Sequence, residues 1–215
     1  MPEIPDVSLT EFMFDEKYGR APFATSLDPY QCGTSSRSIT ATEQKTRVEI
    51  LARAISSDLG WKADEGKEFD KVAGVFALNT VDVPTIHWAI HRLNGIVAPI
   101  SATYTAGELE GLLKRANAKV LFTVMPLLET AKKAAKCCGI SFRNIYIMEM
   151  PEDNGLYEGL VTIRQLLQRG EELPPLEPVR WARGQSAKQI AYMSHSSGTS
   201  GPPVSLLCRF AGVDL

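Results

Sequence analysis

Val72-Ala73-Gly74-Val75-Phe76-Ala77-Leu78 is an uninterrupted apolar run. A run of this length, with no polar residues at alternate positions, is typical of a strand buried on both faces of a parallel sheet. Asp82 and Pro84 follow it and predict the start of a helix that runs to about Asn94, where Gly95 ends it. A β–α unit is therefore expected to begin at this run.

The same alternation of short apolar runs and amphipathic segments continues to about residue 148. The sequence predicts strands over 96–100, 119–123 and 144–148, and helices over 106–116 and 126–138. Because parallel strands joined by short connections need right-handed crossovers, we predict an α/β fold: a doubly wound, mainly parallel sheet flanked by helices. No G-x-G-x-x-G motif follows the first strand, which disfavours a nicotinamide-binding domain.

The segment before the sheet predicts helices and a loop. Ser8 and Glu11 have the spacing of a capping box at the start of a short N-terminal helix. Residues 18–36 are rich in Pro, Gly, Ser and Thr and are expected to form a surface loop, followed by a short strand at 38–40.

Further helices, a linker and a strand are predicted before and after these strands. Thr42 is expected to cap a helix whose apolar side chains recur at three- and four-residue spacing, and Gly60 is expected to end it. After the last of these strands, the sequence predicts a helix over 160–169 and a stiff, proline-containing linker over 170–181. The short apolar run 190–193 is expected to be one more buried strand.

That strand leads into a loop of small hydroxyl side chains and two glycines, Ser196-Ser197-Gly198-Thr199-Ser200-Gly201. Glycine permits the positive φ angles that let several backbone N–H groups converge on one anion. The hydroxyls add donors without bulk, so the loop is predicted to hold a polyphosphate. It is not a Walker A loop, because no lysine follows Gly201. A plain Ser/Gly linker is the alternative interpretation.

The loop resembles the phosphate loop of the adenylate-forming superfamily, which includes acyl- and aryl-CoA synthetases, 4-coumarate–CoA ligases and luciferases. The pattern of that loop is S-S-G-T-[ST]-G-x-P-K-G. The resemblance covers Ser196 to Gly201 and Pro203, whereas Val204 and Ser205 stand at the family's lysine and glycine positions. A weaker resemblance extends over most of the chain from Val7 onwards and is closest to fungal-type acid–CoA ligases.

The resemblance implies that ATP with Mg²⁺ and coenzyme A are used, and that a small carboxylic acid becomes an acyl-adenylate and then a thioester. By this resemblance, the ATP phosphates are held by Ser196, Ser197, Gly198, Thr199, Ser200 and Gly201. Neither a catalytic residue nor a metal ligand is assigned. The implied organisation is an N-terminal α/β subdomain with its linker over 1–180, the start of a second subdomain over 181–203, and a divergent tail over 204–215.

The family's adenine-, ribose- and acyl-binding motifs do not occur in this sequence, and residues 204–215 match nothing in its pattern. We therefore expect a fragment of an acid–CoA ligase that is inactive as this chain. The alternatives are a non-catalytic nucleotide-binding or interaction module (a pseudoenzyme) and an unrelated α/β protein. The strand before the phosphate loop is expected to lack neighbours, which leaves an unpaired edge and exposed apolar surface for self-association.

Composition and targeting signals bear on the partners and the location of the protein. The chain of 215 residues has a net charge of −2, which argues against a nucleic-acid partner attracted by bulk charge. No apolar run approaches the ~20 residues that cross a bilayer. The acidic, proline-rich start is unlike a secretory signal. The last three residues are no peroxisomal tripeptide, so a cytoplasmic location is expected, and a peroxisomal one only for a longer form.

Histidine and cysteine were weighed as candidate site residues. His87 and His91 share one face of a helix at the margin of its buried side. No glutamate follows His87, so the H-E-x-x-H zinc pattern is absent and packing or a surface role is expected. His195 is expected at most to lie behind the residues of the loop that contact phosphate. Reduced thiols, rather than zinc ligands or a disulfide, are expected at Cys32, Cys137, Cys138 and Cys208.

Overall fold

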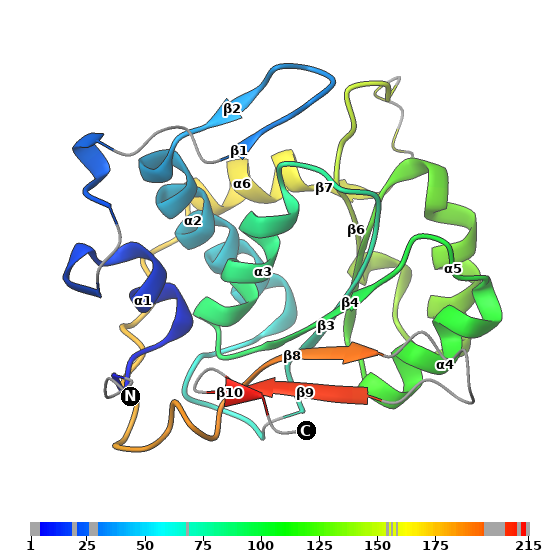
Figure 1. Ribbon diagram of the computed structural model, residues 1–215. Coiled ribbons are helices and arrows are strands. Elements are labelled where there is room, and N and C mark those ends of the chain that lie inside the picture. Colours follow the sequence, from blue (N-terminus) through cyan, green and yellow to red (C-terminus); the bar gives the residue numbers. More distant parts are fainter. Residues whose placement is uncertain are drawn as a thin grey trace.

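The computed structural model describes residues 5–18, 21–25, 30–67, 69–153, 155, 157, 159–195, 205–209 and 212–213. An eight-stranded sheet forms its centre, with the strand order β10-β9-β8-β4-β3-β5-β6-β7 (Figure 1). The strands are β3 (Val72–Phe76), β4 (Ile96–Ile100), β5 (Val120–Thr123), β6 (Ile145–Ile147), β7 (Val161–Thr162), β8 (Ile190–His195), β9 (Ser205–Arg209) and β10 (Gly212–Val213). Neighbours from β8 to β7 run parallel, and β9 and β10 are antiparallel. A mainly parallel α/β sheet is confirmed.

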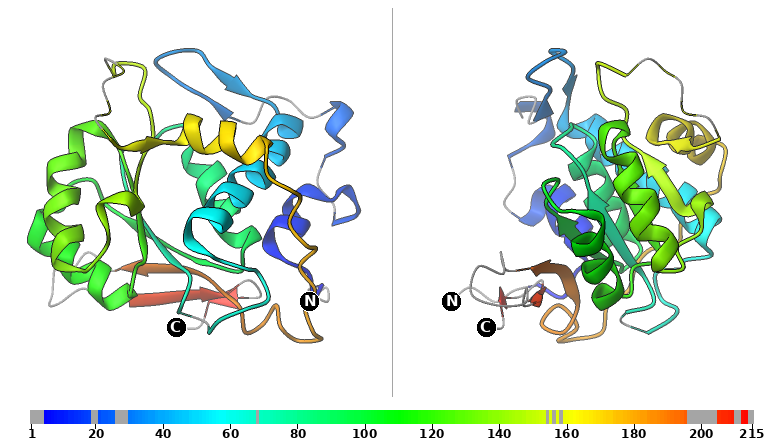
Figure 2. Two further views of the ribbon diagram at one scale, coloured as in Figure 1. Left: turned by 180° about the vertical axis from the view of Figure 1, so that it is seen from behind. Right: turned by 90° about the vertical axis from the view of Figure 1, so that its right-hand side faces the viewer.

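Helices cover both faces of the sheet, as a doubly wound fold requires (Figure 2). One face carries α2 (Ala41–Leu59), α3 (Val83–Arg92) and α6 (Ile163–Glu171), and the other carries α4 (Ala106–Ala116) and α5 (Leu128–Cys137). Outside α3 lies α1 (Leu9–Phe14), whose Phe14 ring meets Trp88 edge-on at 5.2 Å. Short 3-10 turns occur at Glu16–Tyr18, Phe23–Thr25, Met125–Leu127 and Phe142–Asn144. Among the described residues, no helix is both long and apolar enough to span a bilayer.

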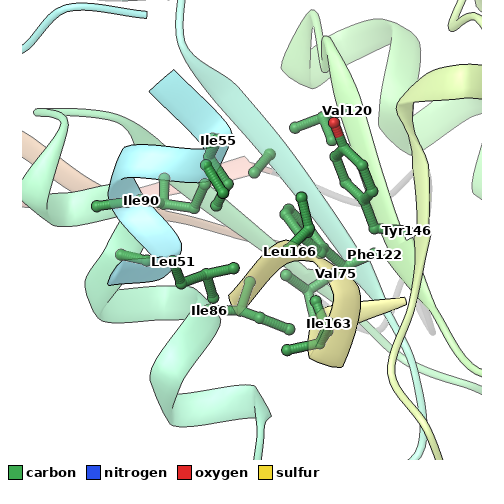
Figure 3. Close-up of a cluster of buried hydrophobic side chains, with 14 of the residues drawn as sticks. Leu51, Ile55, Val75, Ile86, Ile90, Val120, Phe122, Tyr146, Ile163 and Leu166 are labelled. Carbon is green, nitrogen blue, oxygen red and sulfur yellow. The ribbon is translucent and has the colours of Figure 1, made fainter. Parts of the chain in front are cut away.

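The larger hydrophobic core lies between the sheet and the layer of α2, α3 and α6 (Figure 3). At most 1% of each of the following helix residues is exposed: Leu51, Ile55, Ile86, Ile90, Ile163 and Leu166. They pack on strand residues that include Val75, Phe122 and Tyr146. Full burial of one such aliphatic side chain contributes about 1.5–3 kcal/mol, so this core holds the central strands firmly against the helices.

The caps predicted at Ser8 and Gly60 are confirmed, and Thr105 provides a further one. The Ser8 hydroxyl accepts a hydrogen bond from the Glu11 backbone N–H at 3.1 Å, which caps α1. Thr105 and Glu108 form a complete capping box at the start of α4. Gly60 ends α2 with a φ of +66°, in the left-handed region that glycine adopts without strain.

Two predictions at the N-terminal side are wrong. Thr40, not Thr42, is the N-cap of α2, because the Thr40 hydroxyl accepts from the backbone N–H of Glu43, three residues on, at 3.0 Å. The expected loop over 18–36 contains β1 (Tyr30–Gln31), which pairs antiparallel with β2 (Ser38–Ile39). A two-residue strand is too short to show a period-2 pattern in the sequence.

Near the other end, the helix predicted over 160–169 begins only at Ile163. Val161 and Thr162 form β7 instead, and Thr162 caps α6. α6 continues to Glu171, so Gly170 is helical rather than the start of the linker.

The expectation that the strand before the predicted phosphate loop lacks neighbours is also wrong. β8 lies between β4 and β9, at the lower edge of the sheet in Figure 1. β9 comes from the segment 204–215, which follows the predicted phosphate loop. Leu207 of β9 packs against the apolar cluster that contains Ile190 and Met193, which gives this segment a reason to fold back. Self-association of the chain stays a prediction.

Candidate functional site

The predicted phosphate loop joins β8 to β9. Ser196 to Gly201 lie outside the described residues, so the site is built here from what flanks them. His195, the last residue of β8, is paired in the antiparallel register with Ser205, the first residue of β9. The nine residues 196–204 therefore start and end at adjacent points of one hairpin. A closed loop with fixed ends is a suitable frame for backbone N–H groups that converge on an anion.

The strand that leads to the loop is packed on both faces. On one face, Ile190 and Met193 are 1% and 4% exposed and lie in a cluster with Ala116 of α4. On the other face, the Tyr192 ring contacts α3. Between Ile190 and Tyr192, the register of β8 with β9 shifts. β8 thus joins both helix layers immediately before the loop.

His87 and His91 are the α3 side chains that meet Tyr192. Burial lowers the pKa of the His87 imidazole to about 4 and that of His91 to about 3, so both rings are neutral at pH 7. His91 Nδ1 lies 3.3 Å from the carbonyl oxygen of Gly95, and this contact suits an Nδ1–H donor. Packing was the expected role, but burial of His91 to 4% exposure places it inside rather than at a margin.

No described group of three or more His, Cys, Asp or Glu side chains could hold a metal ion. The Nε2 atoms of His87 and His91 have no hydrogen-bond partner among the described residues. With only two imidazoles gathered here, the pair suits ring packing and not metal coordination.

His195 stands directly before the predicted loop. It is half-buried, and both ring nitrogens lack a partner among the described residues. Burial, and then the positive charge of Arg115 at the end of α4, lower its pKa. The end of β8 therefore presents a neutral imidazole near an arginine.

A separate cavity of about 410 Å³ opens beyond the carboxyl ends of β3 and β6. Its charged lining consists of Arg37, Arg47, Asp82, Glu149, Glu152 and Arg164. Arg47 pairs with the buried carboxylate of Asp82, and Arg164 pairs with Glu149 at 3.1 Å. Because these charges compensate one another, the cavity does not have the excess positive charge of a phosphate site.

Cys32 lines the same cavity and was not singled out from the sequence. Hydrogen bonds from Ser35, and then from Thr34, lower the pKa of its thiol to about 6. The Thr34 hydroxyl lies 3.3 Å from the sulfur. The turn Cys32-Gly33-Thr34-Ser35, with hydroxyls two and three residues after a cysteine, is the signal that could have found it. All four cysteines are free thiols, as expected.

We expect Cys32 to be alkylated by iodoacetamide with a midpoint near pH 6, because the thiolate is the nucleophile. Cys138 is the internal control, since burial raises the pKa of its thiol. Peptide mass spectrometry of the intact fold, labelled between pH 5 and 9, measures both rates. In Ser35→Ala the Cys32 midpoint should move toward the usual value of about 8.5. Equal midpoints for Cys32 in the two proteins would contradict this assignment.

Comparisons with known proteins match nearly the whole chain to one enzyme family. The family model described as AMP-binding enzyme matches residues 14–203. The acyl-CoA ligase easD of Emericella nidulans is 33% identical over 204 residues, 93% of this chain and 36% of its own length. The acyl-CoA ligase cm3C of Cordyceps militaris is 35% identical over 192 residues, 80% of this chain and 30% of its own. The chain thus spans about a third of the length of these relatives.

Solved structures show the same fold. The anthranilate CoA ligase AuaEII, in complex with anthranoyl-AMP, superposes with a TM-score of 0.73 at 18% identity, over 96% of this chain and 36% of that protein. The luciferase-like enzyme of the mealworm Zophobas morio superposes with a TM-score of 0.72 at 20% identity, over 98% of this chain and 44% of that protein.

Proposed function

Because this chain belongs to the AMP-binding enzyme family, we propose that it carries the phosphate-binding part of an ATP-dependent acid–CoA ligase. The observation that supports this most directly is the position of Ser196 to Gly201. They directly follow β8, lie inside the matched range 14–203, and connect two strand ends that pair with each other. Family membership removes the interpretation as an unrelated α/β protein.

The proposed role of the loop is to hold the β- and γ-phosphates of ATP. Backbone N–H groups freed by Gly198 and Gly201, together with the hydroxyls of Ser197, Thr199 and Ser200, donate to the phosphate oxygens. The substrate carboxylate then attacks the α-phosphorus, and pyrophosphate leaves. The coenzyme A thiol next attacks the acyl carbon, and AMP leaves. Holding the phosphates in place contributes through orientation and charge stabilisation.

Magnesium fits this scheme as an ion delivered with the nucleotide. The described residues offer no cluster of metal ligands, and Mg²⁺ at nucleotide sites is held largely by phosphate oxygens and water. When bound, it neutralises phosphate charge. This neutralisation matters because Val204 occupies the position at which the family's phosphate loop has a positively charged lysine.

Pyrophosphate exchange into ATP tests the proposal. We expect residues 1–215 to bind Mg-ATP without catalysing exchange, and any longer form of this protein to catalyse exchange with a small carboxylic acid. The alternative, a nucleotide-binding module without catalysis, is favoured by Val204 and Ser205 at the family's lysine and glycine positions. It predicts ATP binding without exchange in both proteins. No ATP binding by either protein would refute the proposed role of the loop.

Substitution of the loop glycines should weaken ATP binding. We expect Gly198→Ala and Gly201→Ala each to raise the Kd for Mg-ATP at least tenfold, because a Cβ restricts positive φ and crowds the phosphates. Gly107→Ala is the control, since a Cβ there meets no atom within 4 Å and α4 stays intact. Isothermal titration calorimetry measures all three. An unchanged Kd in both loop variants would rule out the loop as the phosphate site.

A further inference from the structure

β8 has the shortest regular register with its parallel neighbour. Among the described residues, its register with β4 has a single Cα pair, Val97 with Tyr192. By contrast, β3 and β4 have five pairs, and β8 has five with its hairpin partner β9. Side chains near Tyr192, together with the cluster around Ile190 and Met193, therefore contribute to the direction in which β8 leaves the sheet.

Two imidazoles hold Tyr192 at that point. Its ring centroid lies 4.9 Å from that of His91 at an interplanar angle of 81°, and 5.6 Å from that of His87 at 63°. Both geometries are edge-to-face, and both distances fall within the ~4.5–7 Å at which aromatic rings attract one another. We call Tyr192, His87 and His91 the aromatic clamp.

The pairing of β8 with β9 is irregular next to Tyr192. The register with β9 shifts between Ile190 and Tyr192. A β-bulge re-aims side chains, and here Ile190 and Met193 pack with Ala116 of α4 while Tyr192 meets α3 on the opposite layer. Tyr192 is three residues before His195, whose pairing with Ser205 closes the loop. The clamp therefore acts on the strand that ends at His195, where the loop begins.

We propose that the aromatic clamp is a positioning element: it contributes to the direction of β8 and thereby to the position of His195, the described residue that precedes the predicted phosphate loop. Its effect on nucleotide binding rests on the proposed function above. The ring, and not the phenol hydroxyl, makes the contact, so Phe can replace Tyr192 but a small side chain cannot.

The first test compares Mg-ATP affinity in four proteins well below their unfolding temperatures. Tyr192→Ala should raise the Kd at least tenfold, and Tyr192→Phe should stay within twofold of the wild type. Leu128→Ala is the matched control, because it opens the core under α5, among residues of the other cluster, and should leave the Kd unchanged. An equal Kd in Tyr192→Ala and the wild type would overturn the proposal. If Tyr192→Ala does not fold, Tyr192→Leu takes its place with the same expectation.

The second test needs no nucleotide and separates the clamp from the proposed function. Amide hydrogen exchange is measured for residues 192–195 and 205–209, relative to those of β5. Tyr192→Ala should accelerate the first set at least tenfold, and Tyr192→Phe and Leu128→Ala should not. Absence of ATP binding by the wild type would refute the phosphate-site proposal alone. Unchanged exchange in Tyr192→Ala would refute the clamp.

Discussion

Acidification from pH 7.5 to pH 5 is expected to lower the free energy of unfolding by about 4 kcal/mol. The cause is the burial of His87 and His91, whose pKa values fall to about 4 and about 3 in the folded chain. In the unfolded chain both return to about 6.5. Below that pH the unfolded state binds protons that the folded state does not, so stability rises with pH and is lost as pH falls from 6.5 toward 4.

Urea unfolding at closely spaced pH values measures this effect. Between pH 6 and pH 5 the slope should approach about 2.7 kcal/mol per pH unit, the value for two protons bound on unfolding. The chain has three histidines, so His195→Asn is the matched control and should keep most of the slope. The double variant His87→Leu, His91→Phe should lose most of it. A stability independent of pH across this window would contradict neutral, buried imidazoles.

The carboxylates with lowered pKa values do not change the stability between pH 5 and 6.5. The pKa values of Asp6 and Glu108 are lowered, for Asp6 by hydrogen bonds from Gly184 and Ser186 and for Glu108 by those from Thr105. Their stabilising contributions are present above their ordinary pKa values of about 4 and are lost only as pH falls further. Histidine protonation therefore dominates the change at pH 5 to 6.5, and protonation of the Cys32 thiolate, whose pKa is lowered to about 6, lowers stability in the same direction.

Gly170→Ala is expected to destabilise the fold by about 3 kcal/mol, at the upper end of the ordinary cost of overpacking a core. At Gly170, α6 crosses α2 so closely that an added Cβ would lie 2.2 Å from the carbonyl oxygen of Ile50. No real Cβ approaches a backbone atom to that distance, so one of the two helices must move. Loss of the α2–α6 contact also disturbs the core residues Leu51 and Leu166.

The control for Gly170→Ala is Gly107→Ala in α4. A Cβ at Gly107 has open space, and alanine favours helix by about 0.5–1 kcal/mol over glycine. The two alanine variants should therefore shift the urea midpoint in opposite directions. A midpoint for Gly170→Ala equal to or above that of the wild type would show that the helices do not cross as described.

Local chemistry was enough to predict most of the sheet and its helices. Most of the apolar run 72–78 forms β3, which is buried on both faces, although Leu78 beyond its end is exposed. Ser8 and Thr105 cap helices through neighbours three residues away. A phosphate loop was also predicted from sequence, because glycine and hydroxyl side chains at this spacing suit phosphate binding. Its role stays a proposal.

Tertiary structure decided the features that depend on residues distant in the chain. Tail residues 205–209 become the neighbour of β8 only because Leu207 finds an apolar cluster that 72–116 supplies. Lys71 is buried because carbonyl oxygens of Lys62, Ala63 and Glu65 surround its ammonium group. The sequence shows which residues can be buried or can donate; only long-range packing determines which surfaces meet and, with them, the environment of each histidine.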